Sequence, residues 1–121
     1  MKKLIVTRHR ALIDYLIEND YCNKDTPTMS HAMASDVRGV HVFGVLPLYL
    51  ASEAERVTVV PLYNLPESLR GTELSLEDMR RYAGTPITYS VCRLRDVHPS
   101  DLDAMETSRA YGWSKRKPGG Y

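Results

Sequence analysis

The sequence is poor in cysteine and in long apolar runs. Its 121 residues hold only Cys22 and Cys92, which form no CxxC unit, so we expect free thiols rather than a disulfide framework. No apolar run approaches the ~20 residues that span a bilayer. The apolar stretch after the basic Met1–Lys3 is too short for a signal peptide. These absences predict a cytoplasmic protein with no membrane partner.

The chain also lacks an excess of charge of one sign. Sixteen lysines and arginines face 15 aspartates and glutamates, which gives a formal net charge of +1. Proteins that coat long nucleic acids usually carry a strong basic surplus, so that class is disfavoured. A small anion remains a suitable ligand, because a few well-placed cationic groups suffice to bind it.

Metal-ligand spacing is missing as well. The four histidines form no HxH, HExxH or Cys/His pattern, so we expect neither a metal site nor another cofactor. His31 follows Ser30 in an irregular segment, which by itself is more typical of a surface loop. His41 lies inside an apolar run and is expected to be packed or hydrogen-bonded. His98 shows no signal beyond a turn.

What the sequence does contain is an alternation of strand-like and helix-like patterns. The predicted strands are 4–6, 40–45, 56–62 and, half-exposed near a sheet edge, 87–91; the predicted helices are 11–18, 48–55 and 76–83. Residues 21–39 have no clear assignment. Strands that alternate with short helices predict an α/β fold, with a small Rossmann-like, mostly parallel sheet flanked by helices.

The length fits one domain and leaves no room for a second core. We assign residues 1–97 to this domain and residues 98–121 to a C-terminal extension. A short helix is expected over 100–109, and the basic end, 114–120, is typical of a disordered tail.

Candidate functional residues follow the predicted strands, because ligands of parallel sheets collect at the carboxyl ends of strands. Arg8 and His9 come directly after the first strand and open a helix. A guanidinium can hold two phosphate oxygens at once, and a histidine near its ordinary pKa of ~6.5 can exchange a proton at neutral pH. The pair predicts a pocket for a phosphate-bearing nucleotide; the alternative is a surface pair without a ligand.

Other candidates lie near the same sheet edge. The run Gly44–Pro47 lets backbone approach a ligand but lacks a GxGxxG or P-loop pattern. Tyr49 either stacks on a base or packs in the core. Arg70 either reaches back over the sheet edge or pairs with Glu73 at the surface. The sequence leaves these alternatives open.

Several segments together resemble a known family. They are Val6–His9, the lone His31, Phe43–Ala51 and Leu65–Ser75 with Met79. In this order they are similar to small CRISPR-associated proteins of type III systems that are grouped with the ring nucleases. The resemblance covers residues 4 to 94, and the LPxxLRGxELS stretch is its most specific part.

The resemblance implies a CARF-like Rossmann domain that forms a homodimer and binds cyclic tetra-adenylate across the two-fold axis. It further implies metal-independent opening of the ring to linear products with a 2′,3′-cyclic phosphate. His9 and His31 match family histidines and are the acid/base candidates, and Arg8 is expected to steady the phosphate. The expected ligand-binding residues are Thr7, Arg10, Gly44, Leu46, Pro47, Tyr49 and Arg70.

Two alternatives compete with the ring nuclease. Arg10 stands where relatives tend to have a small residue or proline, so the first alternative is a sponge that binds the ring with little cleavage. The run Val6–His9 is also similar to the RHG opening of histidine phosphatases. There glycine follows the histidine, whereas Arg10 follows it here, and this interpretation ranks third.

Overall fold

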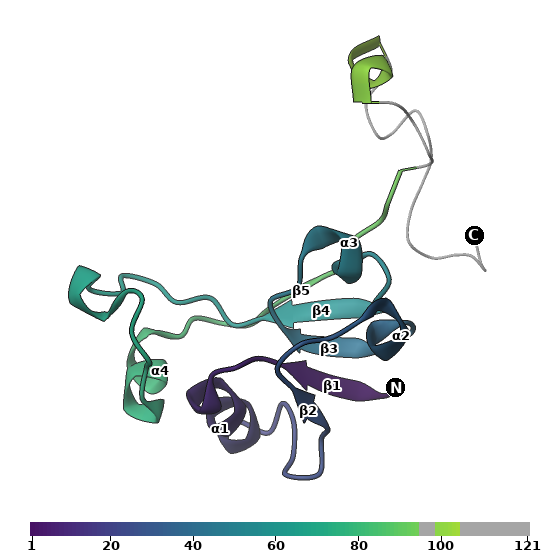
Figure 1. Cartoon of the computed structure of the whole chain (residues 1–121). Coiled ribbons are helices and arrows are strands. Elements are labelled where there is room, and N and C mark those ends of the chain that lie inside the picture. Colours follow the sequence, from purple (N-terminus) through teal and green to yellow (C-terminus); the bar gives the residue numbers. More distant parts are fainter. Residues whose placement is uncertain (95–98, 105–121) are drawn as a thin grey trace.

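A five-stranded sheet organises the computed structural model, which describes residues 1–94 and 99–104 (Figure 1). The strand order is β2-β1-β3-β4-β5, and all neighbouring pairs are parallel except β4 with β5. The strands are β1 (Lys3–Val6), β2 (Thr28–Met29), β3 (His41–Gly44), β4 (Arg56–Val59) and β5 (Ile87–Tyr89). The helices are α1 (Arg10–Glu18), α2 (Ala34–Val37), α3 (Leu48–Ala51) and α4 (Leu76–Tyr82), with 3₁₀ turns η1 (Glu67–Leu69) and η2 (Pro99–Ala104).

This architecture confirms the predicted α/β class and the small Rossmann-like sheet. The segment 21–39, which the sequence left unassigned, contributes the short edge strand β2 and the one-turn helix α2. The strand predicted at the sheet edge is β5, which runs antiparallel to β4 and is exposed along its length. Part of the helix predicted over 100–109 is the 3₁₀ turn η2; the rest, the basic end and His98 lie outside the described residues.

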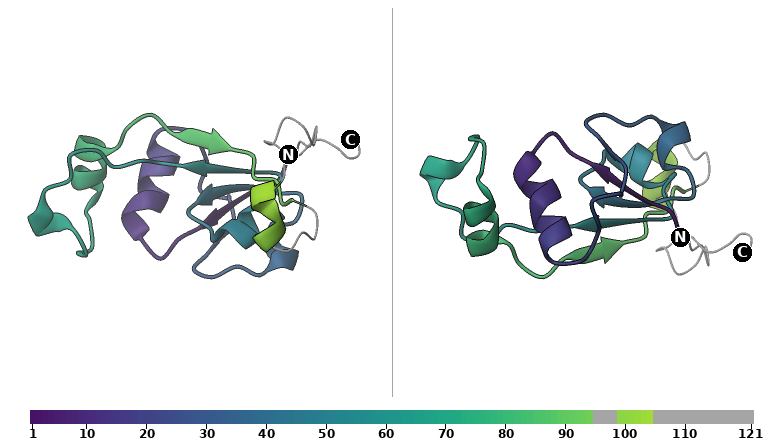
Figure 2. Two further views of the ribbon diagram at one scale, coloured as in Figure 1. Left: turned by 90° about the horizontal axis from the view of Figure 1, so that it is seen from above. Right: turned by 90° about the horizontal axis from the view of Figure 1, so that it is seen from below.

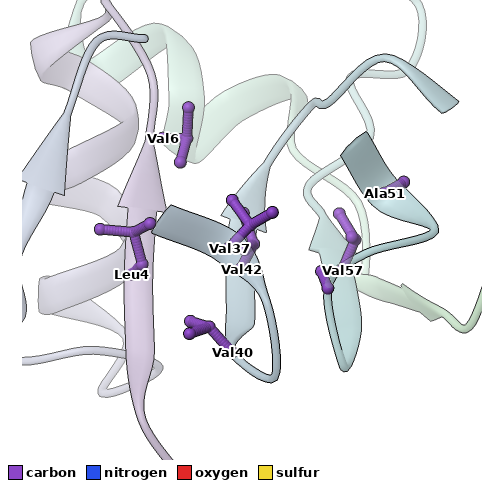
Figure 3. Packing of buried hydrophobic residues seen from close by; sticks show 8 residues of the cluster. Leu4, Val6, Val37, Val40, Val42, Ala51 and Val57 are labelled. Carbon is purple, nitrogen blue, oxygen red and sulfur yellow. The ribbon is translucent and has the colours of Figure 1, made fainter. Parts of the chain in front are cut away.

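Two apolar layers cover the two faces of the sheet. Helices α2 and α3 lie on one face and α1 on the other, as the views from above and below show (Figure 2). Figure 3 shows the first layer, in which the strand residues Leu4, Val6, Val42 and Val57 pack with Val37 of α2 and Ala51 of α3. On the opposite face the cluster contains Ile5, Phe43, Cys22 and Leu16 of α1. The period-two alternation along β1 thus fills both layers.

The predicted helix 48–55 is wrong in length, since α3 ends at Ala51. The chain turns there because Ala54 is fully buried and bridges Arg38, while the backbone N–H of Glu55 donates to the carbonyl of Val40 at 2.9 Å. These tertiary contacts bring the chain back to the sheet after one helical turn. The prediction for α4 is confirmed, including the Ser75 N-cap, which accepts from the backbone N–H of Asp78.

The two cysteines are free thiols, as predicted. Cys22 is buried and Cys92 is partly exposed. Burial raises the pKa of the Cys22 thiol above its ordinary value, which makes it a poor nucleophile. Among residues 1–94 and 99–104, no helix is long and apolar enough to cross a membrane.

The pairing of β1 with β3 depends on Gly44. Its φ of +130° is a backbone conformation that side chains rarely adopt, and a Cβ at this position would lie 2.1 Å from the carbonyl oxygen of Val6. Val6 and Gly44 are register partners. Only glycine therefore permits the two strand ends to come together here.

His41 sits on the α1 face of the sheet, half-buried among hydroxyls. Its Nε2 lies 2.6 Å from Thr58 Oγ1, which lies 2.8 Å from Thr88 Oγ1, and its ring stacks on Phe43. Burial, together with the charges of Arg56 and Lys3, lowers the pKa of His41 from its ordinary 6.5. The prediction of a packed, hydrogen-bonded histidine is confirmed.

Replacing Gly44 with alanine is expected to lower the free energy of unfolding by about 3 kcal/mol or more, because strain adds to a clash with backbone. The matched control is Gly39→Ala. Gly39 also has a positive φ (+72°), but a Cβ added there would meet no heavy atom within 4 Å, so its cost is about 1 kcal/mol. Urea unfolding of both variants measures the difference, and equal losses would contradict the structural role of Gly44.

The low pKa of His41 predicts a specific pH dependence. The unfolded chain takes up the proton more readily than the folded protein, so the free energy of unfolding falls as pH drops through about 6.5. Because glutamine keeps a hydrogen bond to Thr58 but does not titrate, His41→Gln is expected to flatten this slope. Urea unfolding between pH 8 and 5.5 tests it; an unchanged slope in the variant would refute the assignment.

Candidate functional site

A pocket of about 910 Å³ opens at the carboxyl ends of β1 and β3. From β1 the chain first adds β2 on one side and then crosses over to add β3 on the other side. Parallel sheets hold their ligands at such a reversal of the strand order, here between β1 and β3. Residues that follow β1 and β3 line one side of the pocket. The segment between β4 and α4 lines the other.

Arg8 and His31 meet inside this pocket. Arg8 Nη2 lies 3.3 Å from His31 Nε2, although 23 positions separate the two residues. His31 arrives there because it follows β2, whose Met29 pairs with Val6 of β1. Arginine has only donors, so Nε2 of His31 must be the acceptor. The contact therefore holds the guanidinium of Arg8 in place and occupies Nε2 of His31.

His9 occupies the N-cap position of α1. Its backbone N–H donates to Thr7 Oγ1 at 3.1 Å, which fixes the turn between β1 and α1. Its Nδ1 lies 3.6 Å from a carboxylate oxygen of Glu73. The Glu73 contact leaves the other ring nitrogen, Nε2, for a ligand in the pocket. Both side chains are more than half exposed (61% and 67%), so the pair contributes little to stability.

Glu73 belongs to an arm, residues 60–86, that leaves the sheet at β4 and returns at β5 (Figure 1). The backbone N–H groups of Tyr63 and Gly84 close the base of the arm by donating to Tyr82 and Pro61. Arg80 of α4 anchors it to α1 through two hydrogen bonds to the Glu18 carboxylate, with Arg80 Nε 2.9 Å from one oxygen. This contact lowers the pKa of Glu18. The arm is thereby held against α1.

Apart from Thr7, Ser30 and Thr72, the rest of the pocket wall is apolar. The strand-end turns and α3 contribute Val45, Leu46, Pro47 and Leu50, and the arm contributes Leu62, Leu65, Leu69, Leu74 and Met79. Tyr49 lines the mouth and is 72% exposed. A guanidinium and two imidazoles at one place, with apolar surface beside them, suit a ligand that joins phosphate to a flat aromatic base.

The comparisons with known proteins agree with a CRISPR connection. The family described as "Putative CRISPR-associated protein (Cas_VVA1548)" matches residues 4–92, about three quarters of the chain. The chain belongs to this family. Neither the curated proteins nor the solved structures give a match.

The structure places most of the site residues predicted from the sequence at the pocket. The lining includes all three proposed catalytic residues and four of the expected ligand-binding residues: Arg8, His9, His31, Thr7, Leu46, Pro47 and Tyr49. Their roles remain predictions. In the part of the chain that the structure describes, no three or more His, Cys, Asp or Glu side chains group closely enough to hold a metal ion.

Three expected ligand-binding residues do not line the pocket. Arg10 pairs with Asp14 one turn along α1, with Arg10 Nε 3.1 Å from the carboxylate oxygen. Gly44 lies beneath the pocket and is needed for strand pairing. Arg70 ends η1, and no ion pair with Glu73 forms within the described ranges.

Sequence reasoning about this family member missed Glu73 and the arm. It weighed Glu73 only as a surface partner of Arg70, whereas the structure places it against His9. The available signal was the spacing of Leu62, Leu65, Leu69 and Leu74, which lie at the end of the predicted strand 56–62 and in the unassigned segment that follows it. Four apolar residues in an otherwise polar segment indicate contact with another part of the protein, and here they line the pocket.

Proposed function

We propose that this protein is a metal-independent ring nuclease that opens cyclic tetra-adenylate. The observation that carries the proposal is the convergence of Arg8, His9 and His31 on one largely apolar pocket at the reversal of the strand order. Membership of a CRISPR-associated family supplies the biological context. The ligand class follows from the wall: cationic donors suit phosphates, and the apolar surface suits adenine.

The chemistry requires no atom from outside the ring. A ribose 2′-hydroxyl attacks the adjacent phosphorus as its proton is removed, and the bond from phosphorus to the 5′-oxygen breaks as that oxygen gains a proton. The products are linear oligoadenylates that carry a 2′,3′-cyclic phosphate and a 5′-hydroxyl. The protein has to align the hydroxyl with the leaving oxygen, stabilise charge on the phosphoryl oxygens and assist proton transfer.

The contacts in the pocket divide these tasks. His9 is the proton-transfer residue, because Glu73 faces its Nδ1 and leaves Nε2 for the ligand. Arg8 neutralises the phosphoryl oxygens, and its side chain is steadied by His31 Nε2. His31 then acts chiefly as a positioning residue for Arg8, which refines the acid/base role expected from the resemblance.

A CARF-like homodimer is the proposed assembly, with the ring bound between two copies. Val45 and Leu48, at the end of β3 and the start of α3, are 76% and 75% exposed, and Tyr49 is exposed beside them. This apolar group adjoins the pocket lining. A second copy that covers it would exclude water from both surfaces and present a second set of cationic side chains to a ring with repeated phosphates.

Cleavage of cyclic tetra-adenylate by the wild type, Arg8→Ala and His9→Ala tests the proposal. We expect Arg8→Ala to weaken binding by about tenfold or more, because a charge-assisted contact to phosphate is lost. We expect His9→Ala to keep most binding but slow cleavage by roughly 10²-fold or more. Chromatography of products and a binding titration separate the two effects.

Arg38→Ala is the matched control for this experiment, because Arg38 pairs with Glu53 and does not line the pocket. Intact ring bound tightly without linear product would instead establish the sponge. Failure of the wild type both to bind and to cleave would refute the proposed function.

Glu73→Gln is expected to slow cleavage roughly tenfold with binding unchanged, since glutamine cannot hold His9 as a carboxylate does. Its pH–rate profile should also change, which a purely structural role would not cause. The control is Glu67→Gln, an exposed residue of the same arm that does not line the pocket. Equal rates for the two variants would exclude a positioning role for Glu73.

A further inference from the structure

A second group of basic side chains lies at the opposite end of the sheet from the pocket. Lys3, His41 and Arg56 stand at the amino ends of β1, β3 and β4. The strand register pairs Lys3 with His41 and His41 with Arg56. Residues paired in this way point to the same face of a sheet, about 5 Å apart from strand to strand. The three form one row across three adjacent strands, which we call the basic row.

The members of the basic row have no acidic partner among the residues that the structure describes. Like charges directly opposite one another destabilise a sheet, and such pairs are normally relieved by a nearby carboxylate. In the described ranges none of the three residues forms an ion pair. Lys3 and Arg56 thus carry their charges on either side of His41 without a carboxylate paired to them among the described residues, and both charges lower the pKa of His41.

The surrounding contacts hold this row in place above the α1 face of the sheet. Lys3 Nζ donates to the carbonyl of Tyr21 at 2.6 Å and lies 5.5 Å from the centre of the Phe43 ring. The same ring stacks on His41. These contacts place the ammonium group of Lys3 beside the Phe43 ring, against which His41 stacks. Arg56, on the other side, is exposed at the start of β4.

His41 can act as a donor at the centre of the row. The two short distances allow Thr88 to donate to Thr58 and Thr58 to donate to His41 Nε2. This arrangement places the ring hydrogen on Nδ1. An anion beside Nδ1 accepts this hydrogen. It therefore favours this tautomer, or the doubly protonated ring, over the tautomer that carries its hydrogen on Nε2. A bound dianion would offset the two neighbouring charges, those of Lys3 and Arg56, that lower the pKa of His41.

We propose that the basic row is a second anion site, which binds a phosphate dianion such as inorganic phosphate or a terminal phosphomonoester. The site is separate from the pocket and independent of the ring-nuclease proposal. A compact dianion fits better than a long polyanion. Three donors occupy a single row, and the net charge of the whole chain is only +1, which gives a nucleic-acid strand little to follow.

The test is a titration of the isotope-labelled full chain with inorganic phosphate, followed by NMR at constant ionic strength with chloride as the reference. We expect saturable shifts of the Lys3, His41 and Arg56 signals. Arg56→Gln should weaken binding by about tenfold. The matched control, Arg38→Gln, should leave it unchanged, because Arg38 is paired with Glu53. The His41 ring signals should also show that phosphate favours its protonated form.

Each contrary outcome is distinct. Equal shifts with chloride, equal affinity of the two arginine variants, or phosphate shifts confined to Arg8 and His31 would overturn the proposal. A second titration uses a short oligonucleotide with hydroxyl groups at both ends, which offers only phosphodiesters. Binding of this oligonucleotide at the basic row as tightly as phosphate would show that the ligand is a nucleic-acid strand, and would refute the assignment to a phosphate dianion. None of these readouts involves cyclic tetra-adenylate, so failure here leaves the proposed function standing.

Discussion

The close parallel pairing of β1 and β3 is the constraint on which the candidate site depends. At the last register position the carbonyl of Val6 occupies the space that a side chain at Gly44 would need. Once the strands meet in this way, Arg8 and His9 emerge next to the turn from Val45 to Pro47. Every further feature of the pocket is built around that junction, including the contribution of β2, which pairs with the other edge of β1.

Around this junction the protein assembles its charged groups in pairs from distant segments. The loop after β2 supplies His31 to Arg8, and the arm supplies Glu73 to His9. Neither contact is buried enough to stabilise the fold appreciably. Each contact instead brings a side chain from a distant segment beside one at the pocket, and the side chains stay accessible. The arm can do this because its own position is secured elsewhere, by the paired hydrogen bonds between Arg80 and Glu18 and by the buried Met79.

The two ends of the sheet have different characters for a physical reason. At the carboxyl ends the cationic residues have partners and an apolar wall, and we propose a nucleotide ligand there. At the amino ends Lys3, His41 and Arg56 stand next to one another without acidic partners among the described residues. The strands are only a few residues long, so both sites rest on the same small sheet, yet they face opposite ends of it and need not share a ligand.

The sequence by itself determined the α/β class, the main strands and the position of Arg8 and His9 at a strand end. Those features depend on local periodicity and on the strand-end rule, both of which a single chain displays. It also determined the Ser75 cap, because capping chemistry involves residues three positions apart. The predicted length of an element is wrong where tertiary contacts end it. The helix α3, for example, stops after one turn because Ala54 is buried.

Only the tertiary structure decided which side chains meet. His31 looked like an isolated loop residue, and nothing near it in sequence indicates Arg8, because the pairing of β2 with β1 creates the contact. Glu73 was weighed only as a surface partner of Arg70, whereas it faces His9, because the fold of the arm brings its residues to the pocket wall. The basic row likewise exists only through register: its members are 15 or more positions apart and adjoin because three strands align at their amino ends.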